Sequence, residues 1–421
     1  MNSRERVKVS LDHEEPDRIP VDFGGTLVTG MNVSIVYKLR QYFGLDKPGT
    51  PVKVIEPYQM LGEIGKDLMD VLGIDCIGLN GRKNIFNIEN DNWKHWDGYH
   101  GIPVLVPDKF NTVPNKDGSI YMYPEGDKSA PPSGIMPKGG FYFDVIIRQA
   151  KINDENLNVA DNLEEFGNIQ EEDLIYFAEN AKDMFFNTDK AIVANFGGTS
   201  FGDIALVPAP QLKNPKGIRD ITEWYISLST RTNLIIEIFE KQTEIALENL
   251  KKIYEKVENM VTAVYVSGTD FGTQKAPLIS IDTYRKVFKP FHQKVNDWIH
   301  SNTKWKTFIH TCGAIEQFIY DFIEAGFDIL NPVQTSAHGM DPSVLKKKYG
   351  KNIVFWGGGI DTQKTLPFGT EESISHEVAE RIRIFGKGGG FVFNAIHNIQ
   401  PNTPINNVVA MFNTIKKYGK Y

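Results

Sequence analysis

A histidine and a cysteine lie two residues apart, as His310 and Cys312, where an apolar run ends. An imidazole nitrogen and a thiolate at this spacing can bind one metal ion, and zinc accepts both kinds of donor. A third ligand must come from another part of the chain, and His397 is the candidate because it follows the last apolar run. An isolated His-x-Cys pair also fits a small buried cysteine that binds nothing, so spacing alone leaves both interpretations open.

Further polar side chains follow the apolar runs. Asp270, between Gly268 and Gly272, is interpreted as a catalytic acid, a metal ligand, a substrate contact or a helix cap. His397 has a second interpretation as a proton donor that works without metal, because histidine titrates near neutral pH. The active site of a parallel barrel is built at the carboxyl ends of its strands. We therefore expect the substrate to be bound by Gln274, Asn331, Gln334, Asp361 and Asn398.

Short apolar runs alternate with longer helical patterns along the chain. The runs show little polar alternation, as expected for strands that are buried on both faces of a parallel sheet. They cover residues 19–23, 75–79, 191–196, 262–266, 307–310, 328–331, 353–356 and 391–394. The helical patterns cover residues 171–186, 221–257, 282–300, 314–325, 342–349, 371–385 and 404–418. This alternation predicts a single (β/α)8 TIM barrel, with an open doubly wound sheet as the competing architecture.

Residues 84–150 depart from this alternation. They lack helical periodicity and contain several glycines, prolines and aromatic residues, among them Trp93, Trp96, Tyr99, Tyr121, Tyr123, Tyr142 and Phe143. We predict a β-rich insertion after the strand at residues 75–79. It is either a lid over one end of the barrel or an elaborated surface loop. Residues 1–421 are otherwise predicted to form one domain.

The composition excludes several classes of protein. The 46 lysines and arginines are outnumbered by 53 acidic residues, which gives a net charge of −7 and argues against a general nucleic-acid binder. The two cysteines, Cys76 and Cys312, are too few for a disulfide scaffold and suit a reducing compartment. No window approaches the roughly 18 apolar residues of a membrane span. We therefore expect a soluble, cytoplasmic protein.

Several motifs together resemble a known family. They lie at residues 3–7, 15–22, 270–274, 310–313, 326–334, 358–361 and 389–401. With these motifs the chain resembles the uroporphyrinogen decarboxylase superfamily, and within it the corrinoid-dependent, O-demethylase-type methyltransferase branch. The resemblance implies a single TIM barrel. Decarboxylases of the family bind tetrapyrrole carboxylates through an arginine-rich N-terminal segment. The matching residues 20–30 contain no arginine here, which disfavours porphyrinogen decarboxylation.

The resemblance also bears on the metal. Methyltransferases of this branch typically hold zinc through a His-x-Cys pair, which His310 and Cys312 match, and a later cysteine, whose position is occupied here by His397. Decarboxylases of the family also have histidine there. His397 is therefore either a third zinc ligand or a residue that faces the substrate, with Asp270 helping to hold the metal. The chain has no D-x-H-x-x-G pattern, so a partner protein is expected to carry the cobalamin.

Three functions follow as hypotheses. The first is a zinc-dependent methyltransferase that moves a methyl group between a small molecule, such as a methoxylated aromatic, and a corrinoid protein. The second is a metal-independent decarboxylase of a carboxylated small molecule or tetrapyrrole. The third is a non-catalytic barrel that binds a corrinoid or tetrapyrrole. The resemblance further implies a homodimer, since barrels of this family often pair.

Overall fold

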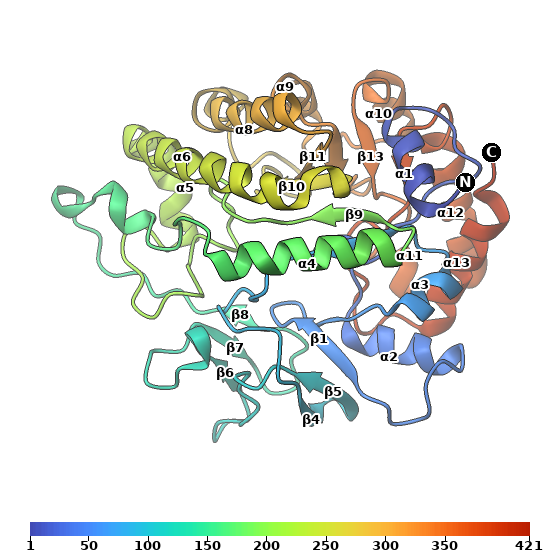
Figure 1. Cartoon of the computed structure of the whole chain (residues 1–421), viewed down its shortest axis with the longest axis horizontal. Coiled ribbons are helices and arrows are strands. Elements are labelled where there is room, and N and C mark those ends of the chain that lie inside the picture. Colours follow the sequence, from blue (N-terminus) through green and yellow to red (C-terminus); the bar gives the residue numbers. More distant parts are fainter.

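Seven parallel strands form a curled sheet at the centre of the computed structural model, which describes residues 1–421 (Figure 1). Their order is β14-β13-β12-β11-β10-β9-β3, so strands of this sheet that follow one another along the sequence are also neighbours in space. Each corresponds to a predicted apolar run, and the arrangement is that of a TIM-barrel-like α/β fold. The strands are β3 (Cys76–Leu79), β9 (Ala191–Ala194), β10 (Ala263–Ser267), β11 (Lys306–His310), β12 (Ile329–Asn331), β13 (Val354–Trp356) and β14 (Phe391–Val392).

The two edges of this sheet are connected by the first predicted run, residues 19–23. Val21 forms a parallel bridge with Phe393, next to β14. The backbone carbonyl of Val21 also accepts a hydrogen bond of 2.7 Å from the amide of Asp75, next to β3. The run is therefore a short extended segment that contacts both edges, rather than a regular strand.

Helices cover the outer face of the sheet, as amphipathic patterns between buried strands require. The stretch at residues 221–257, predicted as one long helix or two, forms two helices that meet at Arg231. The predicted helix at 282–300 contains a π-helical turn, η5 (Tyr284–Phe288), after its first residues. The outer helices are α4 (Glu171–Asn187), α5 (Ile221–Thr230), α6 (Thr232–Val257), α7 (Ile281–Thr283), α8 (Lys289–Asn302), α9 (Ile319–Glu324), α10 (Pro342–Tyr349), α11 (Thr365–Phe368), α12 (Glu371–Phe385) and α13 (Ile405–Tyr418).

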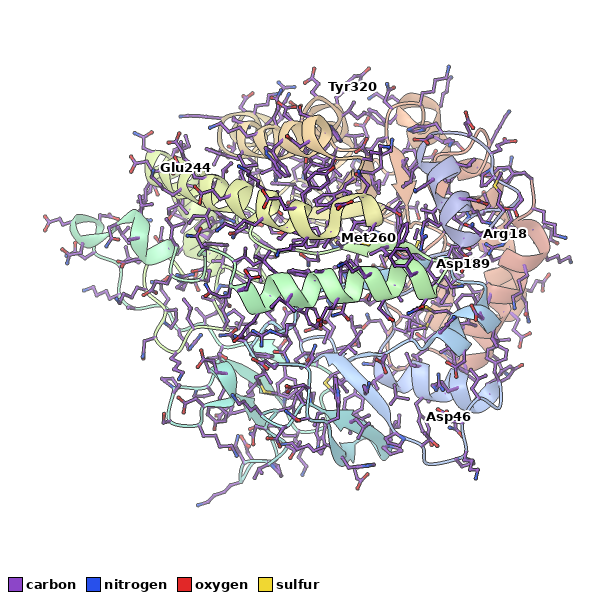
Figure 2. All side chains as sticks on the ribbon, viewed as in Figure 1. Arg18, Asp46, Asp189, Glu244, Met260 and Tyr320 are labelled. Atoms are coloured by element: carbon purple, nitrogen blue, oxygen red, sulfur yellow. The ribbon has the colours of Figure 1, made fainter.

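The sequence patterns did not predict three helices near the N-terminus or the short 3₁₀ turns. The helices are α1 (Ser3–Leu11), α2 (Val33–Tyr42) and α3 (Lys66–Leu72). The turns are η1 (Pro124–Gly126), η2 (Asp154–Asn156), η3 (Val159–Asn162), η4 (Glu258–Met260) and η6 (Glu316–Phe318). None of the helices combines the length and apolar composition of a membrane span. Tyr320 on α9 and Glu244 on α6 extend outward from the helical layer (Figure 2).

Residues 84–150 contain five strands, as the absence of helical periodicity suggested. They are β4 (Lys94–Tyr99), β5 (Ile102–Val106), β6 (Ile120–Met122), β7 (Gly134–Met136) and β8 (Asp144–Val145). The last three form an antiparallel sheet of their own. The first two join β1 (Val52–Glu56) and β2 (Leu61–Gly62) in the order β2-β1-β5-β4. Because β1 and β2 precede β3, this β-rich layer, at the lower side of Figure 1, is not made by residues 84–150 alone.

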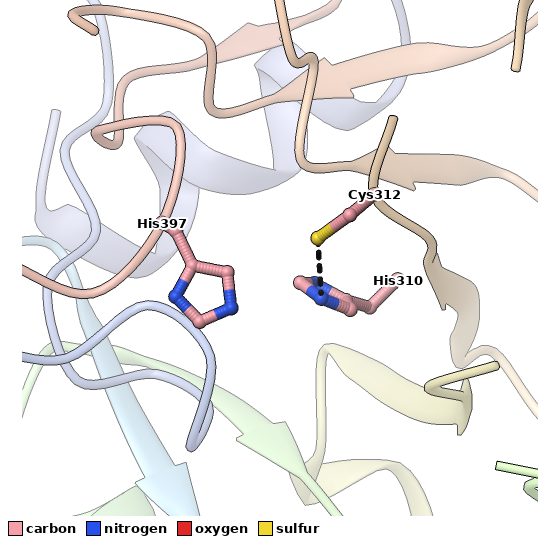
Figure 3. A group of neighbouring side chains, drawn as sticks. All are labelled: His310, Cys312 and His397. Atoms are coloured by element: carbon pink, nitrogen blue, oxygen red, sulfur yellow. Dashed lines mark hydrogen bonds between the residues drawn. The ribbon is translucent and has the colours of Figure 1, made fainter. Parts of the chain in front are cut away.

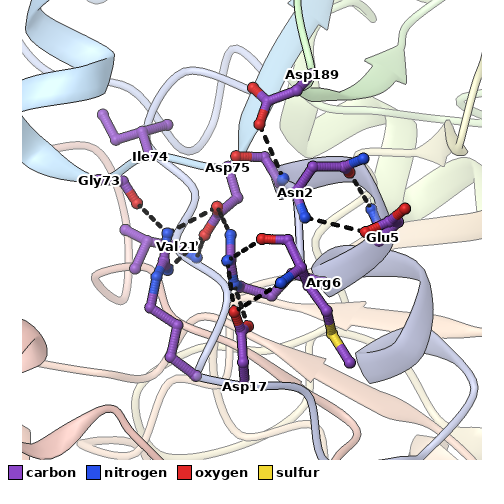
Figure 4. A network of polar contacts seen from close by, with 12 residues as sticks. Asn2, Glu5, Arg6, Asp17, Val21, Gly73, Ile74, Asp75 and Asp189 are labelled. Atoms are coloured by element: carbon purple, nitrogen blue, oxygen red, sulfur yellow. Dashed lines mark hydrogen bonds and ion pairs between the residues drawn. The ribbon is translucent and has the colours of Figure 1, made fainter.

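The amino-terminal ends of the strands are held by a buried ion-pair network (Figure 4). Asp75, directly before β3, is fully buried and accepts hydrogen bonds of 2.8 Å from Arg6 and 2.7 Å from Arg18. Its carboxylate also accepts the amide of Val21. Inside the sheet, 12 buried residues form a separate apolar cluster, so the barrel interior is packed. Chemistry is therefore left to the carboxyl ends of the strands.

Candidate metal centre

His310, Cys312 and His397 lie together at the carboxyl ends of the strands (Figure 3). His310 ends β11, Cys312 lies in the loop that follows, and His397 lies in the loop after β14. One ligand atom from each lies within 4.8 Å of the others. The Cys312 Sγ and His310 Nε2 atoms are 3.5 Å apart. Neighbouring ligand atoms in a tetrahedral zinc site are roughly 3.3–3.8 Å apart, so this pair is already correctly spaced.

The orientation of His310 is fixed by Asn331 on β12. The Asn331 amide donates to the backbone carbonyl of Trp356 at 2.8 Å, which leaves its oxygen facing His310. That oxygen lies 2.6 Å from His310 Nδ1, which must therefore carry the proton. The lone pair of Nε2 then points toward Cys312. Burial lowers the pKa of His310 to about 4, so the imidazole is neutral at pH 7 and suited to bind a metal.

His397 is held in the opposite tautomer. Its Nδ1 accepts a hydrogen bond of 2.8 Å from the backbone amide of Asn398, so the proton of the neutral ring lies on Nε2. Burial, and next the nearby His310, lowers the pKa of His397 to about 4. As oriented here, Nε2 is a hydrogen-bond donor. It becomes a metal ligand only if the proton moves to Nδ1 and the bond from Asn398 opens.

Asp270 positions the Cys312 loop and does not join the three-residue group. Its Oδ1 accepts the backbone amide of Cys312 at 2.7 Å, and its own backbone carbonyl accepts the Tyr225 hydroxyl. Burial raises the pKa of Asp270. Burial, and next the charge of Asp270, raises the pKa of the Cys312 thiol well above its ordinary value. A metal ion that binds here must therefore displace the thiol proton.

A cavity of about 740 Å³ opens beside Cys312 and His397. Phe141 and Tyr142, from the segment at residues 84–150, form part of its lining. The Tyr142 hydroxyl donates to the side-chain oxygen of Gln400. The 18 lining residues include no lysine or arginine. The cavity therefore offers aromatic faces and amide groups to a ligand, but no cationic partner for a carboxylate.

The predicted substrate-binding residues divide into two groups. Gln274 and Gln334 line this cavity, and the Gln334 side-chain oxygen accepts the amide of Gly313 at 2.7 Å. Asn331, Asp361 and Asn398 do not line it. We expected all three to face a substrate, but their side chains are used within the protein. Asn331 supports His310 as described above. The other two are buried loop residues.

Asp361 and Asn398 each hold a loop together. The Asp361 carboxylate accepts the amides of Gln363 and Lys364 and so closes the turn ahead of α11. The Asn398 amide donates to Leu27 O and Gln59 Oε1, and its oxygen accepts the amide of Gly30. Asn398 therefore connects the His397 loop to the N-terminal segment, and through its backbone amide it fixes the His397 tautomer.

The sequence patterns did not single out Asp203, Tyr265 or Tyr142 as site residues. Asp203 lies in the loop after β9. Like the loops after β10 to β14, this loop places a polar side chain after an apolar run, so the same rule could have identified it. Tyr265 lies on β10 and was included only as part of an apolar run. Tyr142 belongs to the aromatic segment, whose sequence gives no direction for its side chains.

Comparisons with known proteins show which family and which fold this chain is similar to. The uroporphyrinogen decarboxylase (URO-D) family model matches residues 214–418, which include all three candidate ligands. Uroporphyrinogen decarboxylases from strains of Coxiella burnetii are 40% identical over 79 residues, which is 19% of this chain and 21% of those proteins. The alignment thus spans about a fifth of those curated relatives. A methyltransferase from Methanosarcina mazei shares the fold, with a TM-score of 0.54 and 15% identity over 99% of each chain.

Proposed function

We propose that this chain, whose residues 214–418 belong to the uroporphyrinogen decarboxylase superfamily as its motifs predicted, is an enzyme that moves a methyl group between a small molecule and a corrinoid protein. The observation that carries the proposal is the grouping of His310, Cys312 and His397 beside a cavity without cationic side chains. A nitrogen and sulfur donor set of this kind favours zinc. The methyltransferase that shares the fold supports the same reaction class.

His310 and Cys312 would hold the metal, and His397 would complete the set after its tautomer changes. Three protein ligands with one open position are usual for catalytic zinc. When bound, zinc supplies Lewis-acid chemistry, which polarises a donor oxygen or lowers the pKa of a thiol acceptor. The protein's own groups do the positioning. Asn331 orients His310, the Asp270 carboxylate holds the Cys312 backbone, and Asn398 links the His397 loop to residues 27–30.

The lining of the cavity supports a neutral, aromatic methyl donor. Phe141 and Tyr142 can stack on a methoxylated ring, and Gln274, Gln334 and Gln400 can bond its oxygen atoms. A tetrapyrrole with several carboxylates would find no lysine or arginine in this lining. We propose that residues 84–150 act as an insertion that shapes this cavity within a single-domain barrel.

A separate corrinoid protein would deliver the acceptor from outside the cavity. Phe368, in the cavity lining, is 83% exposed, and an exposed aromatic side chain at the edge of a site suits an interaction partner. We include homodimer formation in the proposal as the state expected from the family. The role of Phe368 is the part that a single substitution can test.

A second candidate function is favoured by the tautomer of His397. Nε2 of this ring carries a proton and faces the site, so the neutral ring can donate a hydrogen bond to a substrate. A metal-independent decarboxylase would use this N–H to orient the substrate while carbon dioxide leaves. The uroporphyrinogen decarboxylases that match part of the chain are consistent with this reaction class. The uncharged cavity argues for a substrate with few carboxylates.

Metal analysis combined with a methyl-transfer assay tests the proposal. The purified chain should contain close to one zinc per molecule and should methylate cob(I)alamin with a methoxyphenol as the donor. Cys312→Ala should lose both properties. Cys76→Ala is the matched control, because Cys76 is a fully buried thiol inside the barrel and away from the site.

Two results would reject the methyltransferase. One is a Cys312→Ala variant that transfers methyl groups as the parent does and also retains its zinc. The other is carbon dioxide release from a carboxylated substrate that survives chelation and is lost in His397→Ala. The second result would establish the decarboxylase.

A further inference from the structure

A second cavity, of about 610 Å³, lies over the carboxyl ends of β9 and β10. It shares no lining residue with the cavity beside Cys312 and His397. Its lining includes Tyr265 on β10, Gln242 on α6 and Asp203 in the loop after β9. The proposed methyl transfer makes no use of these three side chains.

Each of the three side chains presents a polar atom that no protein group satisfies. Tyr265 is only 8% exposed, yet its hydroxyl makes no hydrogen bond. Gln242 is 2% exposed, and its amide donates to Gly198 O at 2.9 Å while its oxygen accepts nothing. Asp203 accepts the amide of Ala205 with Oδ1 and leaves Oδ2 free. Buried polar side chains are nearly always paired, so the unpaired ends of Tyr265 and Gln242, which face the cavity beside the half-buried Asp203, indicate a ligand.

Two of these atoms converge on one point. A side chain at Gly268 would collide with both the Tyr265 hydroxyl and the Asp203 Oδ2 atom. Glycine at this position therefore lets a phenol and a carboxylate approach each other above the backbone. The arrangement is preformed, because Tyr265 is fixed in β10 and the Asp203 loop is held by its bond to Ala205.

The charge of the cavity is not balanced by the protein. Two of its acidic residues are ion-paired, Glu165 with Arg219 at 2.7 Å and Asp173 with Arg82 at 3.2 Å. Asp203 has no such partner, and burial raises its pKa to about 7. The only lysine or arginine of the lining is Lys83, whose side chain is exposed.

The unpaired atoms define the chemistry of a ligand that would fit this cavity. A carboxylate oxygen and an amide oxygen only accept hydrogen bonds, and a phenol can accept one. Aromatic rings of Tyr58, Phe166 and Phe196 also line the cavity, and such faces attract organic cations. A hard divalent cation needs about six or more oxygen ligands, which these three side chains do not supply.

We propose that this cavity binds a small organic ammonium ion, with Asp203 as its counter-ion and with Gln242 and Tyr265 as hydrogen-bond acceptors. The site shares no lining residue with the cavity at the metal centre. Its occupant is recognised by positive charge, N–H donors and an apolar body that fits the aromatic rings.

Calorimetry on the full zinc-loaded chain at pH 8 tests this inference, with benzylammonium chloride as the probe and benzyl alcohol as its neutral counterpart. The ammonium should bind at least about tenfold more tightly, which corresponds to about 1.4 kcal/mol. Asp203→Asn should abolish that preference. Asp173→Asn should retain it, because Asp173 lines the same cavity but is already paired with Arg82.

Other outcomes overturn the inference. Equal binding of the ammonium and the alcohol would do so, as would an Asp203→Asn variant that keeps the preference. Displacement of the ammonium by stoichiometric magnesium or calcium would assign the site to a metal instead. Tyr265→Phe, expected to weaken the ammonium several-fold, provides the test if Asp203→Asn does not fold. Zinc content measured in the same samples keeps this result separate from that of the methyl-transfer proposal.

Discussion

The side-chain oxygen of Asn331 lies 2.6 Å from Nδ1 of His310, and this one contact determines which nitrogen of the histidine faces Cys312. A histidine that binds a metal usually donates its other ring proton to a neighbouring acceptor, which fixes the tautomer and raises the basicity of the ligand. Here the acceptor is itself fixed, because the Asn331 amide donates to Trp356 O. The pair therefore already has the orientation that a metal ion would need.

Replacing Asn331 with leucine should weaken zinc binding. The substitution keeps the volume but removes the acceptor for His310 Nδ1, so the ring loses its fixed tautomer. We expect zinc affinity to fall about 10–100-fold in competition with a chelator. Asn296→Leu is the control, since Asn296 is equally buried and donates to Ala325 O far from the site. Equal zinc affinity in the two variants would contradict the proposed role of Asn331.

Substitution of His397 with alanine should separate its two roles. If this residue is the third ligand, the variant should bind zinc at least about tenfold more weakly. Loss of a residue that only hydrogen-bonds to a metal ligand already lowers metal affinity by about that factor. His376→Ala, at an exposed position on α12, should bind zinc normally. A His397→Ala protein with full zinc affinity and no turnover would instead identify Nε2 as a hydrogen-bond donor to the substrate.

The aromatic ring of Phe368 should matter for the corrinoid. It lines the cavity and is 83% exposed, so truncation to alanine removes contact area without disturbing the core. We expect KM for free cob(I)alamin to rise about tenfold, equivalent to about 1.4 kcal/mol, with kcat little changed. Phe186→Ala removes a ring that is 75% exposed on α4 and should leave KM unchanged. A similar KM in both variants would exclude Phe368 from the docking surface.

Loss of the Asp75 carboxylate should strongly destabilise the fold. Asp75→Ala removes the buried carboxylate that Arg6 and Arg18 share, and breaking a buried ion pair typically costs about 3–5 kcal/mol. Asp17→Ala removes a carboxylate that also pairs with Arg6 but is 41% exposed, so we expect about 1 kcal/mol or less. Urea unfolding of both variants measures the difference. Equal losses would show that burial does not govern this network.

The stability of the chain should carry a small pH dependence from His300. Its Nε2 lies 2.8 Å from Asp328 Oδ2, and this hydrogen bond raises the pKa of His300. The folded state therefore holds the proton more tightly than the unfolded state does. The stabilisation is complete below pH about 6.5 and is lost as the pH rises through the raised pKa.

His300→Gln measures this contribution. The parent's free energy of unfolding should exceed the variant's by a larger margin at pH 5.5 than at pH 8. We expect the two margins to differ by about 0.2–1 kcal/mol, since the pair is partly exposed and screened. The free energies of unfolding in urea at the two pH values give the comparison. A difference that grows toward pH 8 would have the wrong sign and would reject the pair.

Much of the central sheet was predictable because its strands are buried on both faces. Residues 191–196, 262–266 and 391–394 are short apolar runs with no competing periodicity. Strands β9 and β14 lie within the first and last of them, and β10 extends one residue past the second. The helices α1 and α2 were not predicted, because polar residues interrupt their apolar spacing. The pairing of β1 with β5 could not be predicted from sequence periodicity either, since it joins segments that lie on either side of β3 in the sequence.

The candidate site was predictable in its membership more than in its roles. His310, Cys312 and His397 follow strand ends, and the carboxyl ends of parallel strands meet at one face. Asn331 follows the same rule but is used by His310, because its side chain points along the sheet to a neighbouring strand. The position of a residue in the sequence shows whether it lies at the carboxyl ends of the strands. It does not give the direction of its side chain or the tautomer of a histidine.

The bridge between Val21 and Phe393 has a consequence for synthesis of the chain. The segment that joins the two sheet edges leaves the ribosome early, but its partner beside β14 is among the last residues to be made. The nascent protein therefore keeps its sheet open, with an unpaired edge, until translation is nearly complete. Exposed strand edges favour wrong pairing, so this interval is when the growing polypeptide most needs a chaperone.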